Sequence, residues 1–266
     1  MATSELPAVV DAAWLQVHLD DPDVVVGDVR GPNAHARGHI PGSRPLVLGS
    51  PMPLADREAL EPFAREIQLR FRRHGITGDE RLVLYDRGDG VGAMPALQLA
   101  ELAGHPRVTV LLGGVAGWPD ELEEGPVELT PLRETTIEAN LDAVPTRDRL
   151  AERLGDETLT LLDVRRPEEF SGKKGERCDP RQGHIPGARR IDLESLFAAP
   201  GEPAAPERIR ELVGLPEDAE IVAYCHSGSR SALATLALRS AGYRRARNYP
   251  GSWHEWSRHP ELPAER

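Results

Sequence analysis

One short segment carries the residues with the clearest chemical potential. Its sequence is Cys225-His226-Ser227-Gly228-Ser229-Arg230, and it follows an apolar run that ends at Tyr224. A cysteine thiolate is a strong nucleophile, and the loop amides, the start of a following helix and the Arg230 guanidinium would favour thiolate over thiol. Gly228 tolerates the positive φ that lets such a loop curl around a bound atom. The segment predicts covalent chemistry at Cys225, with residues 226–230 binding the attached group.

The elements on either side place this segment at the end of a strand. Apolar residues 221–224 precede it, and a helical pattern covers Ser231–Ala241. Loops at the carboxyl ends of parallel strands form the ligand-binding edge of an α/β sheet, where loop amides and helix N-termini face anions. A buried inert thiol is the alternative for a free cysteine, but the polar loop ending in arginine favours a reactive one.

The chain contains two copies of one unit. Landmarks recur in the same order, which indicates a duplication. The matched pairs are Val24–Arg30 with Leu159–Arg165, Gly38–Ser43 with Gly183–Ala188, Leu82–Tyr85 with Ile221–Tyr224, and Gly113–Trp118 with Gly251–Trp256.

The two copies differ at the position of the cysteine. In the first copy Asp86 stands where Cys225 stands in the second. An ionised carboxylate only accepts hydrogen bonds and cannot act as a sulfur nucleophile. We expect the first copy to be catalytically silent.

Alternation of short apolar strands with helical stretches predicts an α/β fold with two tandem domains, each a parallel sheet flanked by helices. The helical stretches are Glu58–Arg73, Pro95–Ala103 and Ser231–Ala241. We place a silent domain at residues 1–127, a linker at 128–144, where prolines flank a polar stretch, and a catalytic domain at 145–266.

Composition excludes several classes of partner. The net charge of −11 argues against nucleic-acid and membrane-surface binding. No signal-peptide pattern and no run of about 20 apolar residues occurs, so we expect a cytoplasmic protein.

The two cysteines, Cys178 and Cys225, form no Cys-x-x-Cys motif, so we expect no metal site. Cys178 lies in a polar insertion, residues 171–182, and is expected to be an exposed thiol, with a resolving role as the alternative.

Together, the paired Asp-Val-Arg and Gly-His-Ile-Pro-Gly segments, the Cys225 loop and the closing stretch Tyr249–Trp256 resemble the tandem-domain rhodaneses over nearly the whole chain. The resemblance implies a site in the cleft between the domains and a sulfurtransferase that works through a Cys225 persulfide. It implies no metal or organic cofactor. The implied partners are a small sulfur donor and an acceptor such as cyanide, a thiol or thioredoxin.

The resemblance favours thiosulfate as the donor, because Arg230 ends the loop as in the bacterial thiosulfate-using members. The alternative is 3-mercaptopyruvate. That branch has an arginine where this chain has Glu169, and a second arginine that corresponds to Arg177. A proton relay described for it matches Asp28, His39 and Ser227, although the counterparts Asp163 and His184 indicate packing roles for Asp28 and His39.

Two further side chains have open roles at this stage. Arg165 could bind substrate or form a structural ion pair, and His226 could contact the acceptor or face solvent.

Two other functions of the whole protein remain as alternatives. A cell-cycle-type Cys-loop phosphatase would have one residue more than the four found here between cysteine and arginine. A non-catalytic binding module would have no need of Cys225.

Overall fold

The computed structural model of the chain describes residues 6–48, 57–126, 137–199 and 201–266. The chain divides mainly between Ala143 and Val144 into two compact units, with residues 57–60 grouped with the second, and each unit is described by itself. Most of the expected linker at 128–144 lies outside the described residues, so the domain limits remain a prediction.

The first unit is built on a parallel sheet with the strand order β1-β5-β4-β2-β3. Its strands are β1 (Val9–Val10), β2 (Val24–Asp28), β3 (Arg44–Pro45), β4 (Arg81–Tyr85) and β5 (Val108–Leu111). Its helices are α1 (Ala12–His18), α2 (Pro32–His35), α3 (Arg57–Arg73) and α4 (Ala93–Leu102), with 3-10 turns η1 (Gly114–Gly117) and η2 (Leu141–Ala143).

The second unit has a parallel sheet in the order β11-β10-β6-β7, with a separate antiparallel hairpin of β8 and β9. Its strands are β6 (Leu159–Asp163), β7 (Arg189–Arg190), β8 (Phe197–Ala199), β9 (Glu202–Pro203), β10 (Glu220–Tyr224) and β11 (Ala246–Asn248). Its helices are α5 (Arg147–Glu152), α6 (Pro167–Phe170), α7 (Pro206–Val213), α8 (Ser229–Ser240) and α9 (Ser252–Trp256), with the 3-10 turn η3 (Leu193–Leu196). Across the ranges that the structure describes, no helix combines the length and the apolar composition that crossing a membrane requires.

Strand pairing confirms the predicted duplication and the predicted α/β fold. Asp28 pairs with Tyr85 in the first sheet, and Asp163 pairs with Tyr224 in the second. The order β5-β4-β2-β3 matches β11-β10-β6-β7, and the first unit adds β1 at its edge. The predicted helices begin and end within two residues of α3, α4 and α8.

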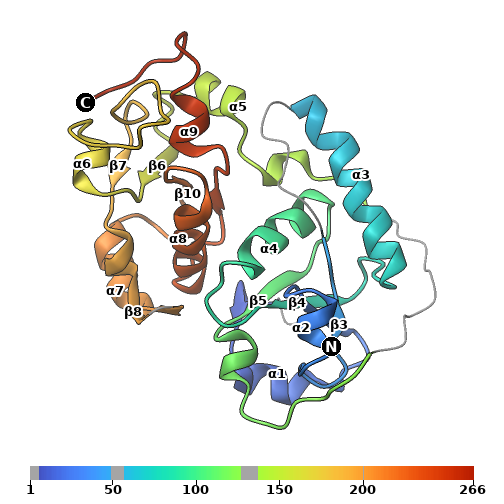
Figure 1. Cartoon of the computed structure of the whole chain (residues 1–266). Helices are drawn as coiled ribbons and strands as arrows, with labels where there is room; N and C mark the ends of the chain where they lie inside the picture. The colour runs from blue at the N-terminus through green and yellow to red at the C-terminus, as the bar shows by residue number, and fades with distance from the viewer. Residues whose placement is uncertain (1–5, 49–56, 127–136, 200) are drawn as a thin grey trace. The chain divides into compact units, whose positions relative to one another are not determined.

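The core of the second unit explains the direction of the Cys225 side chain. Ile221, Ala223 and Cys225 belong to one buried cluster with side chains of α7 and α8, whereas Val222 and Tyr224 belong to a cluster with aromatic side chains of α9. Successive side chains of a strand point to opposite faces, and burial on both faces requires an uninterrupted apolar run. The alternation therefore carries the Cys225 side chain to the face covered by α8, which runs alongside β10 in Figure 1.

A buried ion pair closes the end of β6. Arg165 donates to Asp163 through its backbone N (2.9 Å), Nε (3.0 Å) and Nη2 (2.6 Å), and Nη2 also donates to the Gly183 carbonyl (2.7 Å). Burial would lower the pKa of Arg165, but the bonds with Asp163 outweigh it and raise this pKa. Asp28 and Arg30 repeat the arrangement in the first unit. The Asp-Val-Arg motif thus anchors the Gly-His-Ile-Pro-Gly loop in each unit.

A tyrosine at the end of the neighbouring strand holds the same loop. The Tyr224 hydroxyl accepts from the Ile185 backbone N at 3.1 Å, and the Tyr85 hydroxyl accepts from the Ile40 backbone N at 3.2 Å. Burial raises the pKa of Tyr224 well above its ordinary value, so the hydroxyl stays protonated. The shared motifs therefore form one hydrogen-bonded frame, built twice.

Replacing Arg165 with methionine is expected to lower the free energy of unfolding by about 3–5 kcal/mol, because Asp163 would remain as a buried charge without its partner. The control is Arg166→Ala, which removes an exposed neighbouring charge and leaves the pair intact. Urea unfolding followed by circular dichroism measures both variants. Equal unfolding midpoints for the two would contradict a structural role for the pair.

Candidate active site

Cys225 is held by backbone contacts on both sides. The residue is 1% exposed, and its Sγ accepts a hydrogen bond from the Gly228 backbone N at 3.2 Å. Its own N donates to Ser252 Oγ (3.1 Å), and its carbonyl accepts from the Trp253 N (3.0 Å). The sulfur therefore faces the turn between β10 and α8 in a fixed position.

The turn around the sulfur depends on two unusual backbone conformations. Gly228 has φ of 90°, and a Cβ there would lie 2.6 Å from the Pro250 carbonyl oxygen, so only glycine fits. Ser252 has φ of 53°, and among the described residues it alone has a positive φ without being glycine. Its hydroxyl donates to the Tyr249 carbonyl (2.8 Å) while accepting from Cys225. The stretch at 249–253 thus packs against the loop that begins at Cys225.

The matching turn of the first unit binds its own carboxylate. Asp86 is buried, and its two oxygens accept four backbone N–H groups. Oδ1 accepts from Gly88 (2.8 Å) and Gly90 (3.3 Å), and Oδ2 accepts from Gly92 (2.9 Å) and Ala93 (3.1 Å). The turn between β4 and α4 is thus an anion-binding site whose anion is part of the chain.

Arg230 lies on the first turn of α8 and forms a bidentate ion pair with Glu169 of α6. Nη1 and Nη2 each donate to one carboxylate oxygen at 2.9 Å. Burial would raise the pKa of Glu169, but the bonds from Arg230 outweigh it and the pKa lies below its ordinary value. The bonds with Glu169 raise the pKa of Arg230, and Cys225 adds to this rise. The guanidinium therefore stands near the thiol but shares its charge with Glu169.

The other predicted loop residues have different positions. Ser227 and Ser229 are exposed, and so is Arg177 on the insertion. His226 is partly buried, and its Nε2 lies 3.2 Å from both oxygens of Asp179, so this ring is held by a carboxylate.

Arg165 makes the contacts of a structural ion pair, one of the two roles expected for it. Its guanidinium is buried, bound to Asp163, and lies 5.0 Å from the centre of the Trp253 ring. These contacts occupy the side chain within the second unit, in the same way as Arg30 in the first.

Asp28 and His39 belong to the first unit and make their contacts there. Asp28 is bound by Arg30 and by the Tyr85 hydroxyl (2.9 Å). His39 stacks on His35, with ring centres 3.7 Å apart, and its Nδ1 lies 2.9 Å from the His35 carbonyl.

The second unit repeats this arrangement at His184. His184 stacks on Phe170 at 3.7 Å, and its Nδ1 lies 2.9 Å from the Phe170 carbonyl. The repetition accounts for Asp28 and His39 as parts of the frame.

Three contacts of the site were not predicted from the sequence. They are the pairing of Glu169 with Arg230, the bond from Cys225 to Ser252, and the proximity of Asp179 to His226. The sequence did draw attention to Glu169, because the 3-mercaptopyruvate branch has an arginine at this position. It gave no signal for Asp179, which lies 47 residues before His226.

A buried thiol that accepts a backbone N–H in the turn after a parallel strand is suited to cysteine-dependent group transfer. The family model described as Rhodanese-like domain matches residues 11–121 and 146–259. The chain belongs to the rhodanese family, as the motifs predicted.

Relatives extend over nearly the whole chain. A thiosulfate sulfurtransferase of Azotobacter vinelandii is 33% identical and covers 98% of both chains. A 3-mercaptopyruvate sulfurtransferase of Escherichia coli K12 is 30% identical over 96% of this chain and 97% of its own. A crystal structure of a probable thiosulfate sulfurtransferase is 36% identical, with a TM-score of 0.70 over 92% of this chain and 98% of that chain.

Replacing Asp86 with alanine is expected to lower the free energy of unfolding by at least about 2 kcal/mol, because four backbone donors would lose a charged acceptor. The control is Asp89→Ala, which removes an exposed carboxylate of the same loop that accepts one backbone bond. Chemical denaturation of both variants provides the comparison. A loss no larger than that of the control would show that the amides do not depend on Asp86.

Proposed function

We propose that this rhodanese-family chain is a thiosulfate sulfurtransferase whose nucleophile is Cys225. The thiolate attacks the outer sulfur of thiosulfate, the sulfur–sulfur bond of the donor breaks, and sulfite leaves with the electron pair of that bond. A persulfide then remains on Cys225. A thiophilic acceptor, cyanide or a thiol, attacks the outer sulfur, and the thiolate is regenerated.

The observation that carries this proposal is the hydrogen bond from the Gly228 N–H to Cys225 Sγ. A donor fixed on the sulfur stabilises negative charge there before any substrate arrives, which is the preorganisation that anionic intermediates require. The first unit supports this interpretation, since the equivalent turn already holds the anion of Asp86. We therefore assign sulfur transfer to the second unit and a non-catalytic role to the first.

Charge around Arg230 favours thiosulfate as the donor. A guanidinium has five N–H donors, and the bonds to Glu169 use two of them. The others can meet sulfonate oxygens of a dianion. A second cation in the place of Glu169, which 3-mercaptopyruvate would require for its carboxylate, is missing from this chain. The named relatives include users of either donor.

Arg177 is the best candidate for a second contact with the donor. It is exposed, and it precedes Cys178, whose Sγ lies 3.9 Å from the Nε2 of His226. The insertion thus lies against the residue that follows the nucleophile. We assign Ser227 and Ser229, both exposed on the loop, to contacts with the donor or the acceptor.

Incubation with thiosulfate is expected to add the mass of one sulfur atom to the protein, because the persulfide persists until an acceptor removes it. Intact-mass spectrometry measures the gain, and peptide mapping should locate it on Cys225 and not on Cys178. Cys225→Ser should gain nothing. An unchanged mass in the wild-type protein would refute the proposed function.

With cyanide as the acceptor, kcat/KM for thiosulfate is expected to exceed that for 3-mercaptopyruvate by at least about tenfold, a difference of about 1.4 kcal/mol in transition-state stabilisation. Arg230→Gln should lower kcat/KM for thiosulfate, because Glu169 would then face the dianion without a cation beside it.

The double variant Glu169→Gln/Arg230→Gln is the matched control, since it removes both charges. It should recover part of the activity lost in Arg230→Gln. A preference for 3-mercaptopyruvate, or a double variant no better than the single, would contradict the assignment of thiosulfate.

A further inference from the structure

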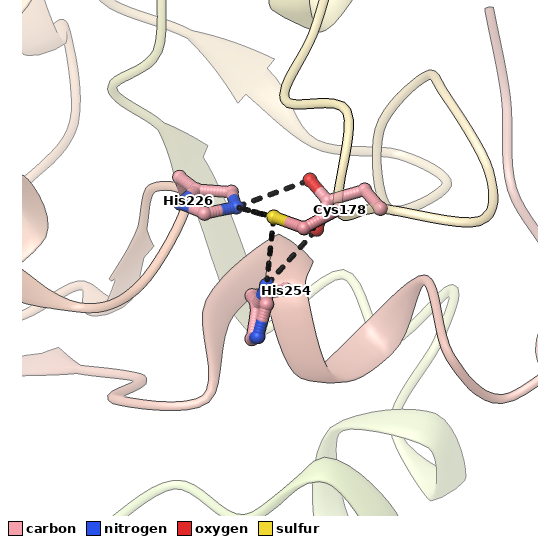
Figure 2. Close-up of side chains that lie close together, drawn as sticks. Cys178, His226 and His254 are labelled. Carbon is pink, nitrogen blue, oxygen red and sulfur yellow. Dashed lines mark hydrogen bonds and ion pairs between the residues drawn. The ribbon is translucent and has the colours of Figure 1, made fainter.

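Four potential metal ligands meet beside the loop of the nucleophile. They come from three segments: Cys178 and Asp179 from the insertion, His226 from the loop after β10, and His254 from α9, as Figure 2 shows for the cysteine and the two histidines. One ligand atom from each lies within 4.8 Å of all the others. We name these four residues the Cys178 cluster.

Four distances between the ligand atoms lie near the edge lengths of a small tetrahedron. Cys178 Sγ lies 3.9 Å from His226 Nε2 and 3.8 Å from His254 Nδ1. Asp179 Oδ1 lies 3.2 Å from His226 Nε2 and 3.0 Å from His254 Nδ1. Ligand atoms on a tetrahedral zinc ion are about 3.3–3.6 Å apart, as follows from bonds of about 2.0–2.3 Å. The four distances differ from these edge lengths by a few tenths of an ångström, and every pair of ligand atoms lies within 4.8 Å.

The chemistry of the donors selects the metal. One thiolate, two imidazoles and one carboxylate form a mixed set of the kind that Zn²⁺ prefers, whereas Ca²⁺ and Mg²⁺ prefer oxygen ligands alone. The thiolate and the carboxylate together carry the two negative charges that neutralise the ion. Four ligands from the protein complete a tetrahedron, which is typical of a structural site and not of a catalytic one.

Surrounding residues hold the ligands in place. The Asp179 side chain is 1% exposed, so its carboxylate is fixed and not free in solvent. Arg258 donates to the carbonyls of Cys178 (2.9 Å) and His254, and its Nη1 lies 3.5 Å from Asp179 Oδ1. Its charge faces the same carboxylate as the two histidines, which balances Asp179 before a metal binds.

A second arginine fixes the insertion to the end of the chain. Arg181 donates to four backbone carbonyls that surround its guanidinium. They belong to Trp256, Ser257, His259 and Leu262. The segments that carry Cys178 and His254 are therefore joined independently of a metal, and binding requires little further ordering.

We propose that the Cys178 cluster binds one Zn²⁺ and thereby ties the insertion to the loop that follows Cys225. The proposal departs from the expectation of no metal, which considered only the spacing of the two cysteines. It gives Cys178 a ligand role in place of a spectator or resolving role. It does not rest on sulfur transfer, because Cys225 is not among the ligands.

The competing explanation is a hydrogen-bonded cluster in which Asp179 binds two histidines and Arg258, with no affinity for metal. The experiment uses the full chain, stripped with a chelator and desalted, then given Co²⁺ or Zn²⁺. Inductively coupled plasma mass spectrometry measures the zinc content after a second desalting. Co²⁺ should give the thiolate-to-cobalt charge-transfer absorption of a cysteine ligand, and Zn²⁺ should abolish it.

We expect one zinc per chain in the wild-type protein and in Cys225→Ser, the matched control for the second thiol. Cys178→Ser should lose the charge-transfer absorption, and His254→Ala should bind zinc at least tenfold more weakly, as competition with a chromophoric chelator measures. Both replaced side chains are partly or fully exposed, and circular dichroism verifies the fold.

Two results would overturn the proposal. One is a wild-type protein that, after stripping and addition of Zn²⁺, retains no zinc through the second desalting. The other is an absorption that persists in Cys178→Ser and disappears in Cys225→Ser, which would assign the metal to the nucleophile. Persulfide formation on Cys225 is measured in a separate experiment. A negative result for zinc therefore leaves the sulfurtransferase proposal standing, and a negative result for the persulfide leaves the zinc proposal standing.

Discussion

Backbone amides at the end of a parallel strand are the constraint on which both units depend. Where β4 or β10 ends, the chain turns through glycine and begins a helix, whose first N–H groups have no partner within the helix and need an acceptor. In the first unit the carboxylate of Asp86 accepts four of them. In the second unit the turn is shorter, and Gly228 donates to the sulfur of Cys225. The same turn therefore surrounds a carboxylate in the first copy and a thiol in the second.

Placing that sulfur requires residues far along the chain. Ser252 adopts a positive φ, which costs a residue with a side chain about 1–3 kcal/mol and persists only where neighbouring contacts determine it. Those contacts are its bonds with the Cys225 N and the Tyr249 carbonyl. The stretch Tyr249–Trp256 is thus part of the site, because its contacts fix the backbone of Cys225. Its tryptophans pack beneath as the core of the same unit.

The sequence was sufficient for everything that local pattern or repetition encodes. Short uninterrupted apolar runs predicted β4 and β10, and comparison of the copies placed Asp86 opposite Cys225. It was not sufficient for contacts between side chains of elements far apart in the chain. Glu169 of α6 meets Arg230 of α8 across 61 residues, and Cys178 of the insertion meets His254 of α9 across 76. Neither pair follows a periodicity, because each depends on how distant segments pack in the folded unit.

The insertion shows how such contacts arise without disturbing the frame. In the first unit α2 leads almost directly into the Gly-His-Ile-Pro-Gly loop, whereas in the second the extra residues 171–182 stand between α6 and the same loop. Both loops nevertheless keep the backbone bridge of their histidine, His39 to Glu123 and His184 to Glu265. Closing a longer loop costs little additional entropy, since the cost grows only with the logarithm of length. The second copy can therefore carry a segment whose residues reach His226, next to Cys225, while its frame remains the same as that of the first copy.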